Sequence, residues 1–327
     1  MLNIAIVSGG DSGEFEVSLK SGKQVELNLD KTKFRPFLIH ITKNQWVCTL
    51  EEVEFPINRH DFSLTLASGR ITFDCVFIAI HGTPGENGIL QGYFELQGLP
   101  YTSCDVTTSA LTFNKSFCKN VVGSYGIFTS KSIHLFREGG DAARKVKELL
   151  SLPVFIKPNN GGSSVGMSKV NQWDELEDAI EKAFHEDDQI LAEEFIKGRE
   201  LTCGVIRSKG KVIALPVTEI ISKKDFFDFE AKYQDGLANE VVPAEIPEFW
   251  ADECRKISCL LYEKLNCSGV VRFDYIHDGS RFCFLEVNTV PGLSEQSIVP
   301  KMVKAQGWTI TDFYTMLIEE SLEKMNG

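Results

Sequence analysis

Positive charge is scarce in this sequence. Its 327 residues include 34 lysines and arginines against 46 aspartates and glutamates, which gives a net charge of −12 at pH 7. This balance excludes non-specific binding to nucleic acid, because the phosphate backbone repels an acidic surface. We therefore expect no nucleic-acid partner.

Long apolar runs are also absent. No stretch approaches the roughly 20 apolar residues that a membrane-spanning helix needs. The apolar run near the N-terminus is short and has no basic start, so we expect no signal peptide. These features predict a protein with no membrane partner.

Cysteine and histidine have no ordered spacing. The nine cysteines are odd in number, irregularly spaced and without a CxxC pair, and the six histidines form no metal-binding pattern. Several cysteines, such as Cys75 and Cys283, lie within apolar runs. Our interpretation is that they are buried, reduced thiols in a cytoplasmic protein.

The first hundred residues alternate between two kinds of element. Apolar strands at 3–10, 34–41 and 75–82 are interleaved with helical spacing at 14–29 and 89–99. Such alternation predicts a parallel, Rossmann-like sheet that binds ligands beyond the carboxyl ends of its strands. Apolar patterning later in the chain predicts one helix over 109–126 and one strand over 211–220.

A hairpin is predicted near the C-terminus. Residues 269–276 and 281–288 have strand character, and the Asp-Gly pair between them favours a tight turn. Residues two apart on a strand face the same side, so Arg272 and Asp274 share a face.

The second strand of this hairpin carries Phe284, Glu286 and Asn288 at the same spacing, which predicts that they share a face. If the two faces meet, Glu286 and Asn288 converge with Asp274. Two carboxylates and an amide supply the oxygen ligands that Mg²⁺ prefers. The alternative is a face that is simply solvated.

Residues 155–170 read FIKPNNGGSSVGMSKV, a strand followed by many small polar residues. No GK[ST] follows the glycines, which excludes a Walker A loop. A loop rich in glycine and serine can point backbone N–H groups at phosphate oxygens, and Lys157 would add a charge. A flexible hairpin turn is the alternative.

Two further segments have ligand-binding potential. Glu193 and Phe195 alternate in a strand-like segment, where a carboxylate beside an aromatic ring could receive an adenosine; an edge strand with a solvated face is the alternative. Glu14 opens the helix after the glycine-rich turn at residues 9–10 and could hold an ammonium group. It could instead only complement the helix dipole.

Seven segments in register resemble the D-alanine–D-alanine ligases of the ATP-grasp superfamily, almost from end to end. They are GGDSGEFEVSLKSG, HGTPGENGILQGYFELQGLPYTS, SALTFNK, KPNNGGSSVGMSKV, EAKY, RFDY and LEVNTVPGLSEQSIVP. The resemblance implies an α/β, three-lobed ATP-grasp architecture. Its predicted parts are a substrate-binding domain at 1–104, a central subdomain with a lid loop at 105–192, and a C-terminal subdomain at 193–327.

The resemblance also implies a role for each candidate residue. Contacts with ATP are implied for Lys115, Lys157, Ser163, Ser164, Glu193, Phe195, Glu200 and Lys232. Two Mg²⁺ ions, or Mn²⁺ in their place, would be held by Asp274, Glu286 and Asn288. Glu14 and His81 would lie at the first D-alanine, and Ser297 and Ile298 at the carboxylate of the second. Arg272 and the Gly292 backbone would stabilise an oxyanion, and Ser163 and Tyr233 would join Glu14 in a hydrogen-bonded set.

The implied reaction joins two D-alanine molecules through D-alanyl phosphate, for peptidoglycan synthesis, in a homodimer. The glycine-rich lid would exclude water from that intermediate. Tyr233 favours D-alanine over D-lactate as the second substrate. The alternatives are an ester-forming D-lactate ligase, another ATP-grasp carboxylate–amine ligase, a nucleotide-binding protein without catalysis, and a purely structural α/β protein.

Overall fold

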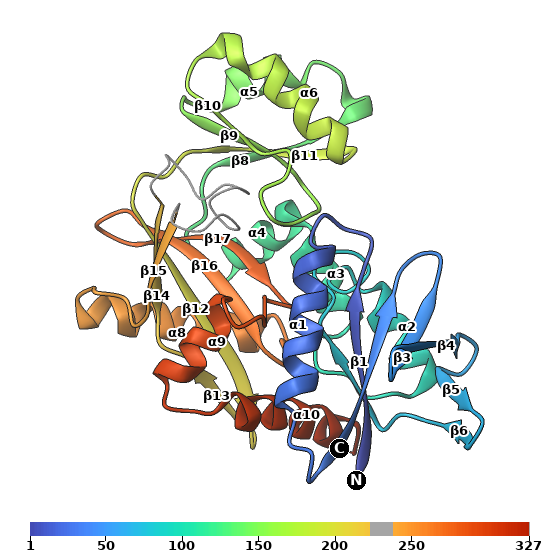
Figure 1. The fold of residues 1–327 in the computed structure, drawn as a ribbon. Coiled ribbons are helices and arrows are strands. Elements are labelled where there is room, and N and C mark those ends of the chain that lie inside the picture. The colour runs from blue at the N-terminus through green and yellow to red at the C-terminus, as the bar shows by residue number, and fades with distance from the viewer. Residues whose placement is uncertain (223–237, 327) are drawn as a thin grey trace.

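Three β-sheets, one after another along the chain, form the framework of the protein (Figure 1). A computed structural model describes residues 1–222 and 238–326. The four-stranded sheet and its helices lie at the top of the view, and the other two sheets lie side by side below it. Both termini lie together at the bottom. The domain boundaries expected after residues 104 and 192 stay predictions.

The first sheet has seven strands. In spatial order they are β6 (Gly69–Ile71), β5 (Ser63–Leu66), β4 (Val53–Asn58), β3 (Trp46–Leu50), β2 (Phe34–Ile41), β1 (Leu2–Gly9) and β7 (Cys75–Ile78). Strand β1 runs parallel to β2 and β7, as predicted, whereas β2 to β6 form an antiparallel meander that we did not predict. The meander strands are short and partly polar, so their apolar periodicity is weak.

Helices α1 (Phe15–Asn28) and α2 (Ile89–Gln97) belong to this part of the chain. Helix α1 packs on β1 through small buried residues, including Ser18, Ser21 and Gly22. A Cβ at Gly22 would lie 2.7 Å from the Cβ of Ser8, so this close approach requires glycine. The helix begins directly after Glu14, at the carboxyl end of β1.

The second sheet is antiparallel. Its strands in spatial order are β10 (Ser168–Val170), β9 (Val154–Pro158), β11 (Gln189–Glu194) and β8 (Ser132–Phe136). Helices α5 (Ala142–Leu149) and α6 (Leu176–Glu186) cover the face that points away from the rest of the molecule (Figure 1). The opposite face of the second sheet, which these helices do not cover, faces the third sheet.

The third sheet is also antiparallel. Its main path is β15 (Ala238–Val241), β14 (Thr218–Ser222), β12 (Arg199–Ser208), β16 (Val271–His277) and β17 (Phe282–Asn288), and β13 (Lys211–Ala214) pairs separately with β12. The single strand predicted over 211–220 is wrong. The chain forms β13 and β14 with Pro216 between them, because proline cannot donate a ladder hydrogen bond.

The helix predicted over 109–126 is also divided. It consists of α3 (Val106–Phe113) and α4 (Lys115–Ser124), and Asn114 between them is extended. The Asn114 side chain accepts a hydrogen bond from the Phe117 N–H at 3.0 Å and so caps α4. The break places Lys115 in the first turn of α4.

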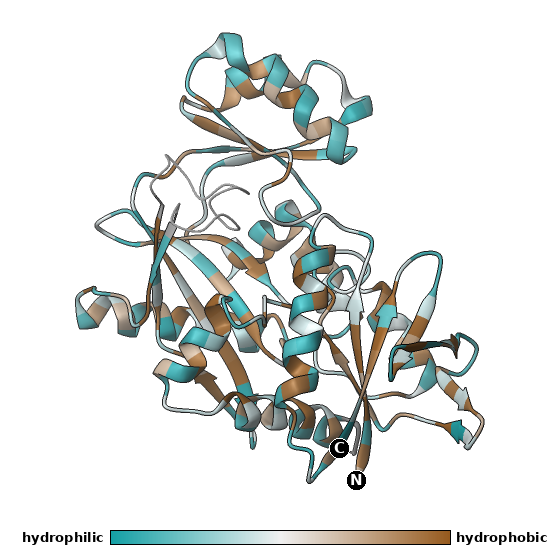
Figure 2. Cartoon of the chain, in the orientation of Figure 1, coloured by the Kyte–Doolittle hydropathy of each residue, from teal (hydrophilic) through white to brown (hydrophobic). Residues whose placement is uncertain are grey.

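The helices α8 (Glu248–Lys264), α9 (Ile298–Ala305) and α10 (Ile310–Asn326) complete the C-terminal part. One buried cluster joins Ile4 and Phe77 of the first sheet to Met302 and Phe313 of these helices. Figure 2 shows apolar residues gathered on β1, β12 and α10, which agrees with this shared core. No helix in the described part of the chain is long and apolar enough to cross a membrane.

Candidate active site

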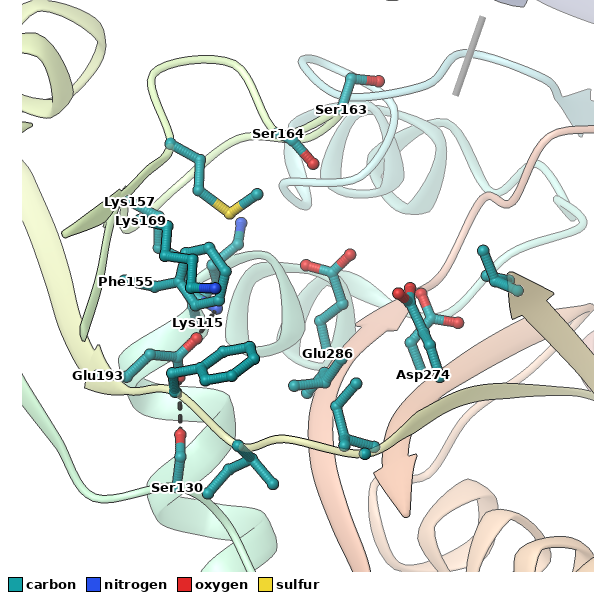
Figure 3. Close-up of a pocket in the computed structure, with 18 of the residues that line it drawn as sticks. Lys115, Ser130, Phe155, Lys157, Ser163, Ser164, Lys169, Glu193, Asp274 and Glu286 are labelled. Carbon is teal, nitrogen blue, oxygen red and sulfur yellow. Dashed lines mark hydrogen bonds and ion pairs between the residues drawn. The ribbon is translucent and has the colours of Figure 1, made fainter. Parts of the chain in front are cut away.

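A cavity of about 700 Å³ lies between the second and third sheets (Figure 3). Strands β9 and β11 line it on one side and β12, β16 and β17 on the other, and the loop at residues 161–167 also borders it. This volume suits a ligand of nucleotide size. Most of the residues that the sequence singled out for ATP or metal line this one cavity.

A buried charge cluster forms one wall. The Glu193 carboxylate makes ion pairs with Lys157 of β9 and with Lys119 of α4, and it accepts a hydrogen bond from the Ser130 hydroxyl at 2.9 Å. Burial alone would raise the pKa of Glu193, but the two lysines outweigh it and hold that pKa well below its ordinary value. Burial opposes charge on Lys157 too, yet Glu193 and Glu286 keep its pKa raised.

Lys119 is a member of this cluster that the sequence reasoning missed. It lies four residues after Lys115 on α4, and this spacing puts two side chains on one helical face. That spacing was the only signal in the sequence that could have pointed to Lys119. It gave no indication of a partner, because Glu193 lies 74 residues further along the chain.

Beside the charge cluster, an aromatic side chain borders the cavity. Phe195 follows the end of β11, its ring is 5.8 Å from that of Phe155, and the Lys169 ammonium lies 4.3 Å from its centroid. Glu200 of β12 also lines the cavity. Glu193, Phe195 and Glu200, predicted to line an adenosine site, therefore border the same space.

The glycine-rich loop between β9 and β10 lies over the cavity. Gly161, Ser163 and Ser164 have φ angles of 128°, 53° and 58°, and few residues other than glycine adopt such values readily. The Lys115 ammonium donates to the Gly161 carbonyl at 2.5 Å. The loop is thus a structured turn that reaches Lys115.

The same loop contacts Glu14, which lies beyond the carboxyl end of β1. The Ser163 hydroxyl donates to the Glu14 carboxylate at 2.5 Å, which is one of the hydrogen bonds expected from the sequence. A Cβ at Gly162 would lie 2.6 Å from Glu14 Oε2, so glycine at 162 permits this approach. Two other predicted residues, Lys232 and Tyr233, lie outside the described residues.

The hairpin of β16 and β17 forms the opposite wall. Arg272 pairs with Asn288 and Asp274 with Glu286, so the predicted convergence of these four residues is confirmed. In Figure 3, Glu286 lies between the lysines and Asp274, and its carboxylate points toward the loop that carries Ser163 and Ser164.

The expectation that Phe284 shares a face with Glu286 is wrong. A register shift between Asp274 and Tyr275 makes Phe284 pair with Tyr275, and both are fully buried in the core. The bulge contains Leu285, which lines the cavity beside Glu286. An extra residue of this kind interrupts the two-residue alternation, which sequence patterning cannot detect.

Asp274 is at the centre of the hairpin's polar contacts. It accepts from Arg272 Nε and Nη2 at 3.0 and 2.9 Å, from Asn288 Nδ2 at 2.9 Å, and from the Thr202 hydroxyl at 2.5 Å. Burial opposes charge on Arg272, but the Asp274 carboxylate outweighs it and raises the pKa of the guanidinium. Arg272 is therefore a permanent cation at this wall.

The metal site expected at this hairpin contains two carboxylates and an amide. No group of three or more His, Cys, Asp or Glu side chains among residues 1–222 and 238–326 could hold a metal ion. Asp274, Glu286 and Asn288 are not such a group, because the third member is an amide. Their oxygen donors match a hard cation that takes its other ligands from phosphate.

His81 is buried, and Glu86 is partly buried, where the first sheet meets the segment after β17. Both ring nitrogens of His81 are engaged, Nδ1 with the Val290 carbonyl at 2.7 Å and Nε2 with the Ser21 hydroxyl at 2.8 Å. Burial lowers the pKa of His81, so the ring is neutral. Burial, aided by Glu14, raises the pKa of Glu86 to about 7. The sequence reasoning missed Glu86, although HGTPGENG contains it.

The segment after β17 brings the remaining candidates together. A Cβ at Gly292 would lie 2.7 Å from the Ser297 hydroxyl oxygen, so these two residues are in close contact. Ser297 is the N-cap of α9, and the side chain of Ile298 is buried in the core. Only the backbone of Ile298, at the helix N-terminus, is placed to meet an anion.

Comparison with known proteins identifies the family. The family models described as "D-ala D-ala ligase N-terminus" and "D-ala D-ala ligase C-terminus" match residues 3–104 and 120–319. The chain belongs to the D-alanine–D-alanine ligase family. A "D-alanine--D-alanine ligase" of Flavobacterium johnsoniae is 46% identical over 98% of this chain and 100% of its own length, and one of Azobacteroides pseudotrichonymphae is 44% identical over 98% and 99%.

Solved structures agree with the D-alanine–D-alanine ligase assignment. The "VanG D-Ala:D-Ser Ligase" of Enterococcus faecalis has a TM-score of 0.87 at 33% identity, covering 98% of this chain and 99% of its own. The "D-alanyl-alanine synthetase A" of Vibrio cholerae has a TM-score of 0.89 at 27% identity, covering 98% of both chains. The predicted ATP-grasp fold and enzyme class are thereby confirmed. Members of this family use ATP and a divalent metal.

Proposed function

We propose that this protein joins two D-alanine molecules into D-alanyl-D-alanine, with ATP converted to ADP and phosphate, for peptidoglycan synthesis. The observation that carries the proposal is one cavity with lysines on one wall and Arg272, Asp274 and Glu286 on the other, where Asn288 bonds Asp274. Lysines neutralise transferring phosphate, and a fixed arginine neutralises a developing oxyanion. Both steps of a carboxylate–amine ligation need these groups.

The ATP roles follow from position. Lys115 and Lys157 would hold phosphates beneath the loop that carries Ser163 and Ser164, and that loop would exclude water from the intermediate. Glu193, Phe195, Glu200 and Lys232 would line the adenosine side. Asp274, Glu286 and Asn288 fit two Mg²⁺ ions, with Mn²⁺ as an alternative, because all three offer oxygen donors. When bound, the metal neutralises phosphate charge.

In the first step, the carboxylate of one D-alanine attacks the γ-phosphorus of ATP while Glu14 holds its ammonium group. D-alanyl phosphate and ADP result. The hydrogen bond from Ser163 fixes the Glu14 carboxylate, and Tyr233 would complete this set. Positioning supplies most of the rate enhancement, since the phosphoryl group needs little covalent assistance.

In the second step, the free amine of the second D-alanine attacks the acyl phosphate. Arg272 and the Gly292 N–H would bind the tetrahedral oxyanion, and phosphate then leaves. Ser297 and the N–H of Ile298 would hold the second carboxylate at the N-terminus of α9, whose dipole favours an anion.

Replacing Gly162 with alanine tests the role of Glu14. The new Cβ would lie only 2.6 Å from the present position of Glu14 Oε2. It would therefore displace the Glu14 carboxylate and weaken its hydrogen bond from Ser163. We expect the KM for D-alanine to rise about tenfold, because hydrogen bonds to charged groups contribute about 1.5–3 kcal/mol. The KM for ATP should stay within about twofold. Gly123→Ala is the matched control, since a Cβ there meets no atom of the described residues within 4 Å.

A D-alanine–D-serine ligase is the second candidate. The enterococcal structure named for that activity has 33% identity and a TM-score of 0.87. Tyr233, which favours D-alanine as the acceptor, lies outside the described residues. D-Lactate, which is similar in size to D-alanine, is a third candidate acceptor.

The test is to supply purified protein with Mg·ATP and D-alanine, follow phosphate release, and identify the product by mass. D-Serine and D-lactate compete at equal concentration. D-Alanyl-D-alanine in equal amount to phosphate would support the proposal. D-Alanyl-D-serine or an ester as the main product would instead assign D-serine or D-lactate as the second substrate. Phosphate release without a condensed product would contradict the proposal.

We also infer a homodimer in the cytoplasm. On helix α2, Ile89 and Leu96 are 61% and 87% exposed and lie seven residues apart, which places two apolar side chains on one outward face. An apolar helix face of this kind favours association. Light scattering of the purified protein measures the oligomeric state.

A further inference from the structure

The four residues 290–293 follow β17 and carry Gly292, the proposed oxyanion donor. This segment belongs to the C-terminal part of the chain, yet three side chains from the first ninety residues hold its backbone. They are Ser21 on α1, His81 after β7, and Glu86 in the following loop.

Glu86 holds the start of the segment. Its Oε1 accepts the Val290 N–H at 3.2 Å, and its Oε2 accepts the Gly82 N–H at 2.7 Å. The carboxyl group therefore bridges the loop after β7 and the loop after β17. Glu86 is partly buried, and a carboxylate withdrawn from water is costly unless it meets such donors, so this placement is specific.

His81 and Ser21 hold the rest. The neighbouring Val290 carbonyl can only accept, so His81 Nδ1 carries the proton and donates to it at 2.7 Å. Nε2 then accepts from the Ser21 hydroxyl at 2.8 Å. The Ser21 oxygen in turn accepts the Leu293 N–H at 3.1 Å. The Val290–Pro291 and Gly292–Leu293 peptide groups are thus fixed, one before and one after the Pro291–Gly292 peptide that carries the Gly292 N–H.

We propose that Glu86, His81 and Ser21 act together as a clamp that aims the Gly292 N–H at the tetrahedral intermediate. They are positioning residues, because they act through backbone groups and not on the substrate. The proposal rests on the ligase function above. It also assigns His81 a role other than contact with the first D-alanine, since both of its ring nitrogens are used within the clamp.

Helix α1 links the clamp to the proposed ammonium site. Glu14, which would hold the first ammonium group, is the N-cap of this helix, and Ser21 lies two turns further along it. One rigid helix therefore sets the spacing between the bound amino group and the oxyanion donor. A misplacement of about 1 Å in such a site can cost about 100-fold in rate.

The test compares Ser21→Ala with Ser18→Ala. Both serines are fully buried on α1, and each hydroxyl makes two hydrogen bonds. Among the described residues, the Ser18 hydroxyl bonds Gly9 and Ala79 and does not reach residues 290–293, so its replacement is a matched control for lost stability. The readouts are the kcat for dipeptide, the KM for ATP, and the phosphate released per dipeptide formed.

For Ser21→Ala we expect kcat to fall about 10- to 100-fold, with the KM for ATP within about twofold of wild type. Phosphate released per dipeptide should rise, because acyl phosphate that meets no aimed donor is hydrolysed. Ser18→Ala should match the wild type in all three readouts. Glu86→Gln, which keeps one acceptor oxygen, should reproduce the Ser21→Ala pattern. It tests the proposal independently if either serine variant fails to fold.

The clamp would be overturned if Ser21→Ala and Ser18→Ala had the same kcat and the same phosphate released per dipeptide, and if Glu86→Gln matched the wild type in that ratio. Absence of dipeptide from the wild-type protein would instead overturn the proposed function, and the clamp's role with it.

Discussion

Arg272→Ala should abolish ligation while leaving ATP bound. Arg272 Nε and Nη2 pair with Asp274, and its other three N–H groups bond no residue in the described part of the chain, so they can meet an oxyanion. Removing one oxyanion donor costs about 10²–10³ in rate, and Arg272 is a charged one. We expect dipeptide formation to fall at least that far and the Kd for ATP to change less than about threefold.

Arg272→Lys is the control for charge alone. It keeps a cation beside Asp274 but cannot form the two parallel hydrogen bonds, so its kcat should lie between those of the wild type and Arg272→Ala. Removal of one partner of a buried pair can cost about 3–5 kcal/mol, so urea unfolding must accompany the kinetics. Equal loss of ATP binding and ligation in a folded Arg272→Ala protein would exclude the oxyanion role.

Glu193→Gln should be the most destabilising conservative change in the cavity. The variant leaves Lys119 and Lys157 buried side by side without their shared carboxylate. We expect the free energy of unfolding to fall by about 3–5 kcal/mol at pH 7, as for other broken buried ion pairs. Saturating ATP should restore more stability to the variant than to the wild type, because its phosphates supply the missing negative charge.

The pH dependence gives a second check on Glu193. The lysines hold its folded pKa below the ordinary value of 4.5, so its stabilisation is complete above that value and is lost as the pH falls below it. The difference between wild type and variant should therefore shrink in acid. Glu319→Gln is the control, since the Lys33–Glu319 pair is exposed on both sides and should change stability by less than about 1 kcal/mol. A similar loss in both variants would contradict the buried-cluster assignment.

Regular local patterns carried most of the fold prediction. Strand β2 coincides with the predicted range 34–41, and the Asp-Gly turn joins β16 and β17 as expected. The errors came where one residue changes the local geometry. Asn114 caps α4 and ends a run of helical spacing, and Pro216 divides a run of apolar residues into β13 and β14.

The hairpin shows the same limit within the site. Two-residue spacing predicted that Asp274, Glu286 and Asn288 converge, and the register confirms it. The bulge at Leu285 was not predictable, because it depends on how Phe284 packs against Tyr275 in the core. Sequence spacing describes a regular strand, whereas bulges arise from packing.

The sequence by itself determined the family, the order of the elements and the types of residue available for the chemistry, since motif spacing and periodicity are local properties of the chain. Only the tertiary structure decided which groups share a charge or a proton. Lys119 meets Glu193 across 74 residues, and Glu86 and His81 meet Val290 across more than 200. Such contacts depend on how three separate sheets pack together, and no local pattern records that packing.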